Sequence, residues 1–200
     1  MTEPTHNFRL WLFRKEAAFR LTDSALVWVE DGVGRKVDFA DIRQIRVYES
    51  PGVENVPRTG RCVVTPHEGR AVVLQSNHFV GVGEFEDRSA SYAPFVAELI
   101  RRVAAANPRV VFIRGMPTAL WVTWHVLLAL VLVVTPLAFA AMIYAQAHDR
   151  ELSPNFFIQL AVCAGVFFAF FPILRLIRRN RPQVFDPLNW PPDLGRTGAD

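Results

Sequence analysis

The chain has 200 residues, with 22 Lys and Arg against 19 Asp and Glu, and a formal net charge of +3. Residues 1–118 carry 16 basic and 14 acidic side chains without a concentrated basic stripe, which argues against nucleic-acid binding. Residues 116–147 contain no Asp, Glu, Lys or Arg. Of the two cysteines, Cys62 lies in the charged first part of the chain and Cys163 in a hydrophobic run, which excludes a disulfide framework.

Residues 1–13 read as an arm that mixes aromatic and basic side chains. The stretch FRLWLFRK at 8–15 suits an anionic membrane surface or a protein partner, and we assign that contact to Arg9, Trp11, Arg14 and Lys15. A first strand of the following domain is an equally good interpretation. No secretory hydrophobic region follows the polar residues 1–7, so we expect no cleavable export signal.

Residues 14–114 are expected to form a soluble domain of short antiparallel strands. Phe19 and Leu21 alternate with polar residues before a turn at 22–24, and Leu26 and Trp28 alternate after it, which predicts a hairpin. Turns are also predicted at 30–34 and 67–69, a loop at 50–60, and one weak, bulged strand at 79–85. About six or seven strands result, and they need a second element to cover their apolar faces.

A helix is expected to follow these strands. Ser91 is the predicted cap, Pro94 is tolerated in the first turn, and Asn107-Pro108 ends the helix. Apolar side chains recur at helical spacing, which predicts a buried stripe: Phe95, Val96, Leu99, Ile100 and Val103. The helix is expected to plug one opening of a strongly bent sheet.

The stretches FRLTDSALVWV at 19–29 and KVDFADIRQIRVY at 36–48, followed by one helix, resemble the bacterial pleckstrin-homology-like domains that are fused to membrane spans. The resemblance covers roughly residues 14–107. It implies an α+β fold class, with a bent antiparallel β-barrel capped by one C-terminal helix and followed by a two-helix transmembrane hairpin. It also implies a role in binding. The first hairpin loop, Thr22-Asp23-Ser24, is not basic as it is in lipid-binding eukaryotic members, so phosphoinositide recognition is not expected.

Two hydrophobic runs predict the hairpin. Residues 117–147 exceed the roughly 20 residues that a span requires, and Trp121, Trp124 and Tyr144 sit where aromatic side chains meet lipid headgroups. A short extracytoplasmic loop is expected at 148–155 and a second span at 156–177. Small residues recur every four positions on that span, which predicts a helix-packing stripe of Ala161, Gly165 and Ala169.

Basic residues flank the hairpin at both ends. Arg114 precedes the first span, and a cluster follows the second: Arg175, Arg178, Arg179 and Arg181. The positive-inside rule places both flanks in the cytoplasm, which predicts a multi-pass protein of the bacterial inner membrane with both termini cytoplasmic.

The tail at 178–200 is basic and then proline-rich, which predicts an extended conformation. Its apolar residues, of which Phe185 and Trp190 are the largest, are expected either to pack on the soluble domain or to dock into another protein.

No motif for a nucleophile, a phosphate cradle or a catalytic zinc occurs, so we expect a non-enzyme without cofactor or metal. Glu84, Glu86 and Asp87 are interpreted as solvated charge, and His125 as an interfacial side chain.

The leading hypothesis is a membrane-anchored binding module, an accessory or assembly subunit of a larger complex. Its partners would be membrane lipids and other membrane-protein subunits or further copies of the chain. A sensor of anionic lipid surfaces is the alternative, and a transport-related or enzymatic role is a remote one.

Overall fold

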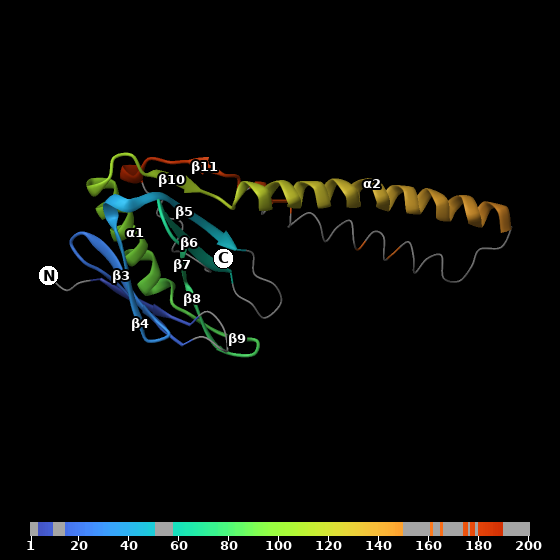
Figure 1. The fold of residues 1–200 in the computed structure, drawn as a ribbon. Helices are drawn as coiled ribbons and strands as arrows, with labels where there is room; N and C mark the ends of the chain where they lie inside the picture. The colour runs from blue at the N-terminus through green and yellow to red at the C-terminus, as the bar shows by residue number, and fades with distance from the viewer. Residues whose placement is uncertain are drawn as a thin grey trace. The chain divides into compact units, whose positions relative to one another are not determined.

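The structure is a computed structural model that describes residues 4–9, 15–50, 58–149, 161, 165, 174–175, 177–178 and 180–189. The chain divides into two units. Residues 1–116 and 182–200 form one unit, here called the head, and residues 117–181 form the other, here called the membrane unit. The fold is mixed α+β: strands and one helix make the head, and a long apolar helix leads the membrane unit (Figure 1).

The first sheet of the head is an antiparallel meander of four strands in chain order. These are β1 (Thr5–Phe8), β2 (Ala17–Leu21), β3 (Ala25–Glu30) and β4 (Val33–Asp38). The predicted hairpin at 22–24 is present, and its turn is closed by the Thr22 N–H donating to the Ala25 carbonyl over 3.0 Å. Of the two interpretations of the N-terminal arm, residues 5–8 follow the one that makes them a first strand.

The second sheet contains five strands in the order β11-β10-β5-β6-β7. They are β5 (Ile42–Ser50), β6 (Thr59–Pro66), β7 (Val72–Gln75), β10 (Val111–Arg114) and β11 (Gln183–Val184), with the 3-10 turns η1 (Phe39–Asp41) and η2 (Pro187–Asn189) beside them. The expectation of a purely antiparallel sheet is wrong, because β10 runs parallel to β5. Parallel neighbours require a long crossover, and the intervening chain with its helix provides it.

The single weak strand expected at 79–85 is wrong. The chain instead makes a separate two-stranded hairpin of β8 (Asn77–Gly81) and β9 (Glu84–Asp87). Gly83 adopts φ +78°, a left-handed conformation that glycine takes without steric cost, and this permits the turn. The predicted bulge does occur, as a register shift between Phe79 and Gly81.

Helix α1 (Ser89–Ala106) packs between the two larger sheets and buries the whole predicted apolar stripe, together with Tyr92 (Figure 1). The predicted cap at Ser91 is wrong: the helix begins earlier because an Asp87 carboxylate oxygen accepts the Ser89 N–H over 2.8 Å. At the other end the Asn107 side-chain amide donates to the carbonyls of Ala40 and Ile42. The helix is therefore fixed at both ends to neighbouring strands and turns.

A closed barrel is not formed. The described strands fall into three separate hydrogen-bonded sheets, and among the described residues no ladder joins β4 at the end of the first sheet to β7 at the end of the second. The expectation failed because closure depends on pairing between two edges that are distant in sequence, and these edges stay apart.

The membrane unit contains α2 (Thr118–Asp149). Within it, residues 118–141 have a mean hydropathy of 2.2, so this helix is long and apolar enough to cross a membrane. The second span expected at 156–177 lies almost wholly outside the described residues. Near its end, the carbonyl of Ile177 accepts the Trp121 indole N–H over 3.2 Å, which joins residues from the two ends of the unit.

Candidate binding groove

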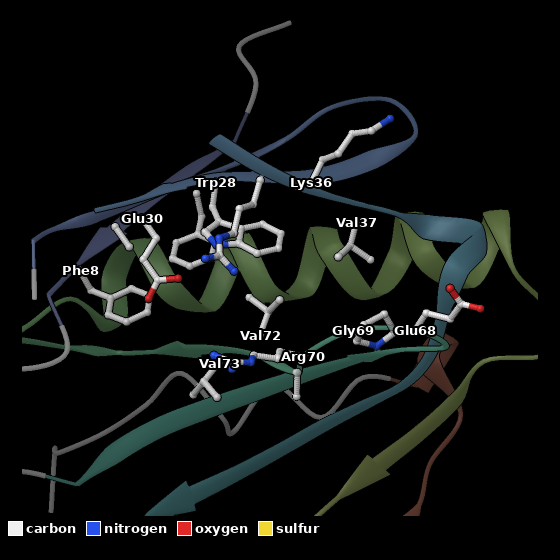
Figure 2. Close-up of a pocket in the computed structure, with 15 residues that line it drawn as sticks. Phe8, Trp28, Glu30, Lys36, Val37, Glu68, Gly69, Arg70, Val72 and Val73 are labelled. Carbon is white, nitrogen blue, oxygen red and sulfur yellow. The ribbon is translucent and has the colours of Figure 1, made fainter. Parts of the chain in front are cut away.

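A groove of about 770 Å³ lies in the head between the first sheet and the turn that joins β6 to β7. Figure 2 looks into it, with strands of the two sheets above and below and α1 behind. Its floor is apolar, with Phe8, Phe19, Trp28 and Val72. Its rim is charged and carries both signs: Glu30, Arg35, Lys36, Glu68 and Arg70.

Two of the floor side chains, Phe19 and Trp28, belong to one row that runs across the four strands of the first sheet. His6 is paired with Phe19, Phe19 with Trp28, and Trp28 with Arg35, so all four lie on the inner face of the sheet. The Phe19 ring stacks between Phe8, with centroids 5.3 Å apart, and Trp28, at 6.1 Å. The row begins in buried core and ends at the exposed Arg35, because α1 packs more closely against β1 than against β4.

The opposite wall comes from the turn between β6 and β7. Gly69 takes φ +95° in that turn, and the His67 N–H donates to the Asp41 carbonyl over 2.8 Å, which holds the turn against η1. Val72 follows with its side chain directed to the inner face, where its partner across the ladder, Val64, is also buried. The wall is therefore a fixed feature of the second sheet.

Two of the strands that line the groove, β4 and β7, stand at the edges of their sheets. Among the described residues, β4 bonds only to β3 and β7 only to β6, so each strand has one side whose backbone groups make no ladder. Such an edge is a template for another extended chain. The groove thus combines main-chain donors and acceptors with an apolar floor.

The cations at the rim are mostly free to meet a ligand. In the part of the chain that the structure describes, Arg35 and Arg70 make no hydrogen bond or ion pair, while Lys36 lies 3.5 Å from Asp38 in an exposed pair. The acid Glu68 also has no partner among the described residues. Exposed pairs of this kind contribute little to stability, so Lys36 is available for recognition together with Arg35 and Arg70.

A second polar cluster centres on His6, which is 1% exposed. Its Nε2 lies 2.9 Å from the Gln75 carbonyl, which can only accept, so Nε2 carries a proton, and Nδ1 lies 3.0 Å from the Ser91 hydroxyl. Burial lowers the pKa of His6, which favours the neutral ring. A histidine beside a serine hydroxyl is also found in nucleophilic catalysis, but this pair joins β1, β7 and α1 inside the core, and neither side chain lines the groove. We interpret its role as structural, because its hydrogen bonds hold these three elements together.

Three of the residues that the sequence assigned to binding, Arg9, Lys15 and Phe185, lie in the part of the chain that the structure describes. The Arg9 guanidinium donates to the carbonyls of Phe79 (2.9 Å) and Val80 (2.6 Å), while the exposed Lys15 donates its backbone N–H to Asp31 over 3.3 Å. Trp11, Arg14 and Trp190 lie outside the described residues, so their assignment stays a prediction.

Phe185, the remaining residue of that assignment, packs on the head. Its ring lies 5.9 Å from that of Phe112, beside a smaller groove of about 230 Å³. Its backbone N–H donates to the Phe112 carbonyl over 3.1 Å. This is the first of the two interpretations that the sequence left open for the tail.

The groove between the sheets was missed from the sequence. One signal was present: residues 33–38, VGRKVD, place Arg35 and Lys36 in a strand where the neighbouring strands carry large apolar residues. A strand of that kind is typical of a sheet edge.

The predicted anchors are placed in part. Trp121 and Trp124 are half-buried near the start of α2, Tyr144 is exposed near its end, and Arg114 closes β10. The Nδ1 of His125 bonds the Trp121 carbonyl over 2.8 Å. Arg175, Arg178 and Arg181 are exposed, and Arg179 lies outside the described residues.

The predicted packing stripe is seen at two positions. Ala161 and Gly165 are exposed, and no atom lies within 4 Å of a Cβ built on Gly165. Ala169 lies outside the described residues, so the packing role of the stripe stays a prediction.

Comparison of the chain with family models, with curated proteins and with solved structures gives no match.

Proposed function

We propose that this chain is a membrane-anchored binding module, in which a pleckstrin-homology-like head is held at the cytoplasmic face of the bacterial inner membrane as an accessory or assembly subunit of a larger complex. The observation that carries the binding role is the groove, since within the described residues it leaves two sheet edges without partner strands over an apolar floor. The pleckstrin-homology-like character is supported by two sheets that face each other and one helix, α1, packed between them.

The anchoring is supported by the apolar helix. α2 is 32 residues long, or about 48 Å at 1.5 Å per residue, against a hydrocarbon core of about 30 Å. Large apolar side chains along it are exposed to the surroundings, among them Leu130, Val133 and Leu137. A helix with these side chains is stable in lipid and not in water.

The two-span hairpin is supported by where the membrane unit begins and ends. β10 ends at Arg114, β11 begins at Gln183, and these two residues are paired in adjacent antiparallel strands. The chain therefore leaves the head and returns to it at one place, on one side of any bilayer that it enters. A path with both ends on one side crosses the membrane an even number of times, and residues 150–182 are long enough for one helical return.

Co-purification tests the proposal. The full chain, tagged and extracted in mild detergent, should retain at least one other membrane protein at a fixed ratio. The control is a second tagged two-span protein of similar abundance from the same membranes. Recovery of the chain alone, at every detergent concentration that keeps known complexes intact, would contradict the proposal.

Topology is tested separately with reporters after residue 149 and after residue 189. The reporter at 149 should behave as exported and the one at 189 as cytoplasmic. An exported reporter at 189 would exclude the hairpin.

A sensor of anionic lipid is the second candidate, favoured by one observation. The β8–β9 turn exposes Val80 and Val82, the latter 88% exposed, and the Arg9 guanidinium is held beside Val80. Apolar side chains with a neighbouring cation suit a bilayer surface. Hydrogen exchange of the full chain in nanodiscs distinguishes this candidate, since anionic lipid should protect residues 78–86 and zwitterionic lipid should not.

A further inference from the structure

We propose that β4 binds an extended, acidic segment of a partner protein, which joins the first sheet as an additional strand and lies in the groove. This inference rests on the proposed binding function and names the chemistry of the partner at that site. A peptide is the favoured ligand because β4 offers backbone donors and acceptors along an edge that no other described strand pairs with, and only an extended chain satisfies both in alternation.

The register of the first sheet fixes which side chains the added strand would meet. On the inner face, β4 presents Val33, Arg35 and Val37, because these residues pair with Glu30, Trp28 and Leu26 of β3. Side chains directly opposite one another in adjacent strands interact most strongly. The matching segment therefore carries an apolar residue opposite each valine and a carboxylate opposite Arg35.

Charge complementarity supports the acidic position. Among the described residues Arg35 has no hydrogen bond or ion pair, and Arg70, on the opposite wall, has none either. A carboxylate placed in the groove between these two side chains would form charge-assisted hydrogen bonds with a guanidinium. The acids Glu30 and Glu68 lie at the same rim and disfavour a ligand that is anionic along its whole length, such as a lipid headgroup cluster.

The inward pattern of the predicted segment is apolar, acidic, apolar at every second residue. This pattern reads the same in both directions, so it fits β4 whether the added strand is parallel or antiparallel. The probe is the capped heptapeptide Thr-Val-Thr-Glu-Thr-Val-Thr. Two control peptides replace its glutamate by lysine or its central segment by one containing proline, which cannot donate to the ladder.

The experiment is hydrogen exchange of the full chain in zwitterionic nanodiscs, with each peptide added in turn. The glutamate peptide should slow exchange at residues 33–38, and both control peptides should bind about tenfold more weakly or not at all. In an Arg35→Glu variant the preference should invert, so that the lysine peptide protects β4. Arg43→Glu, at an exposed position of β5, is the matched control and should leave the preference unchanged.

Several results would overturn the inference. If no peptide protects residues 33–38, the charges of β4 serve only to keep the edge free of other strands. Equal binding of the glutamate and lysine peptides would show that Arg35 does not recognise the charge of the bound segment. Protection of β4 by anionic nanodiscs without any peptide would assign the groove to lipid. If no peptide binds but co-purification still recovers a partner, only this inference is wrong and the proposed function stands. If the glutamate peptide binds but co-purification recovers no partner, the proposed function is contradicted and peptide binding stands as a separate result.

Discussion

The ring of Phe185 lies against that of Phe112, with centroids 5.9 Å apart, although the whole membrane unit separates the two residues in the chain. This contact, with the pairing of β10 and β11, makes the segment after the membrane unit part of the head.

Replacing Phe185 with alanine should destabilise the head by about 1–3 kcal/mol, because a half-buried aromatic ring is removed from the edge of the core. Thermal unfolding of the full chain in nanodiscs, followed by tryptophan fluorescence, measures the change. Leu188→Ala is the control, since Leu188 lies three residues on and is 88% exposed. An equal loss in both variants would mean that Phe185 does not pack as described.

Replacing Gly60 with alanine should lower the free energy of unfolding of the head by about 1–3 kcal/mol. A Cβ at this position would lie 2.9 Å from the Cε1 atom of Tyr92, closer than van der Waals contact, and the Tyr92 ring is buried. Gly34→Ala is the matched control, because nothing lies within 4 Å of a Cβ there. Chemical denaturation should separate the two variants clearly, and a neutral Gly60→Ala would show that Tyr92 does not occupy this place.

The head should lose stability as the pH falls below about 6.5, the ordinary pKa of a histidine. Burial lowers the pKa of His6 in the folded state, so the unfolded chain binds a proton more readily. The stability is fully present above the unfolded pKa, falls as the pH drops toward the folded pKa, and then levels off. Burial also lowers the pKa of His78, which adds to the same trend.

The contribution of His6 can be isolated by measuring melting temperatures between pH 5 and pH 7.5. His6→Gln should flatten the slope, whereas His67→Gln, at an exposed turn, should keep it. An unchanged slope in His6→Gln would place the titration elsewhere.

Cys62 should resist alkylation at pH 8 in the folded protein. Its side chain is fully buried and burial raises the pKa of the thiol to about 12, so neither access nor the reactive thiolate is available. In a Cys163→Ser background, iodoacetamide followed by mass spectrometry should find Cys62 unmodified until denaturant is added. Rapid labelling of the native protein would contradict the burial of β6.

The elements that were predicted correctly are those whose signal is local. Alternation at Phe19, Leu21, Leu26 and Trp28 marks a hairpin because successive side chains of a strand point to opposite faces. The stripe on α1 follows from helical spacing in the same way. Both patterns are complete within a few consecutive residues.

The elements that were missed depend on distant partners. β10 and β11 are too short to show alternation, and they become strands by pairing with β5 and with each other. The groove has no local pattern either, since it exists because two edges fail to meet. That α2 is long and apolar enough to cross a membrane could be predicted, because hydropathy depends only on the residues of the segment itself.

The position of β11 also bears on the order in which the protein matures. Most of the head is synthesised before the membrane unit, namely the first sheet, β5 to β7, α1 and β10. The strand β11 is synthesised only after the membrane unit. Until then β10 has an open side and the ring of Phe112 lacks its cover. Completion of the head must therefore wait for synthesis of the apolar segment, so a chain that stops within that segment would leave β10 without its partner β11.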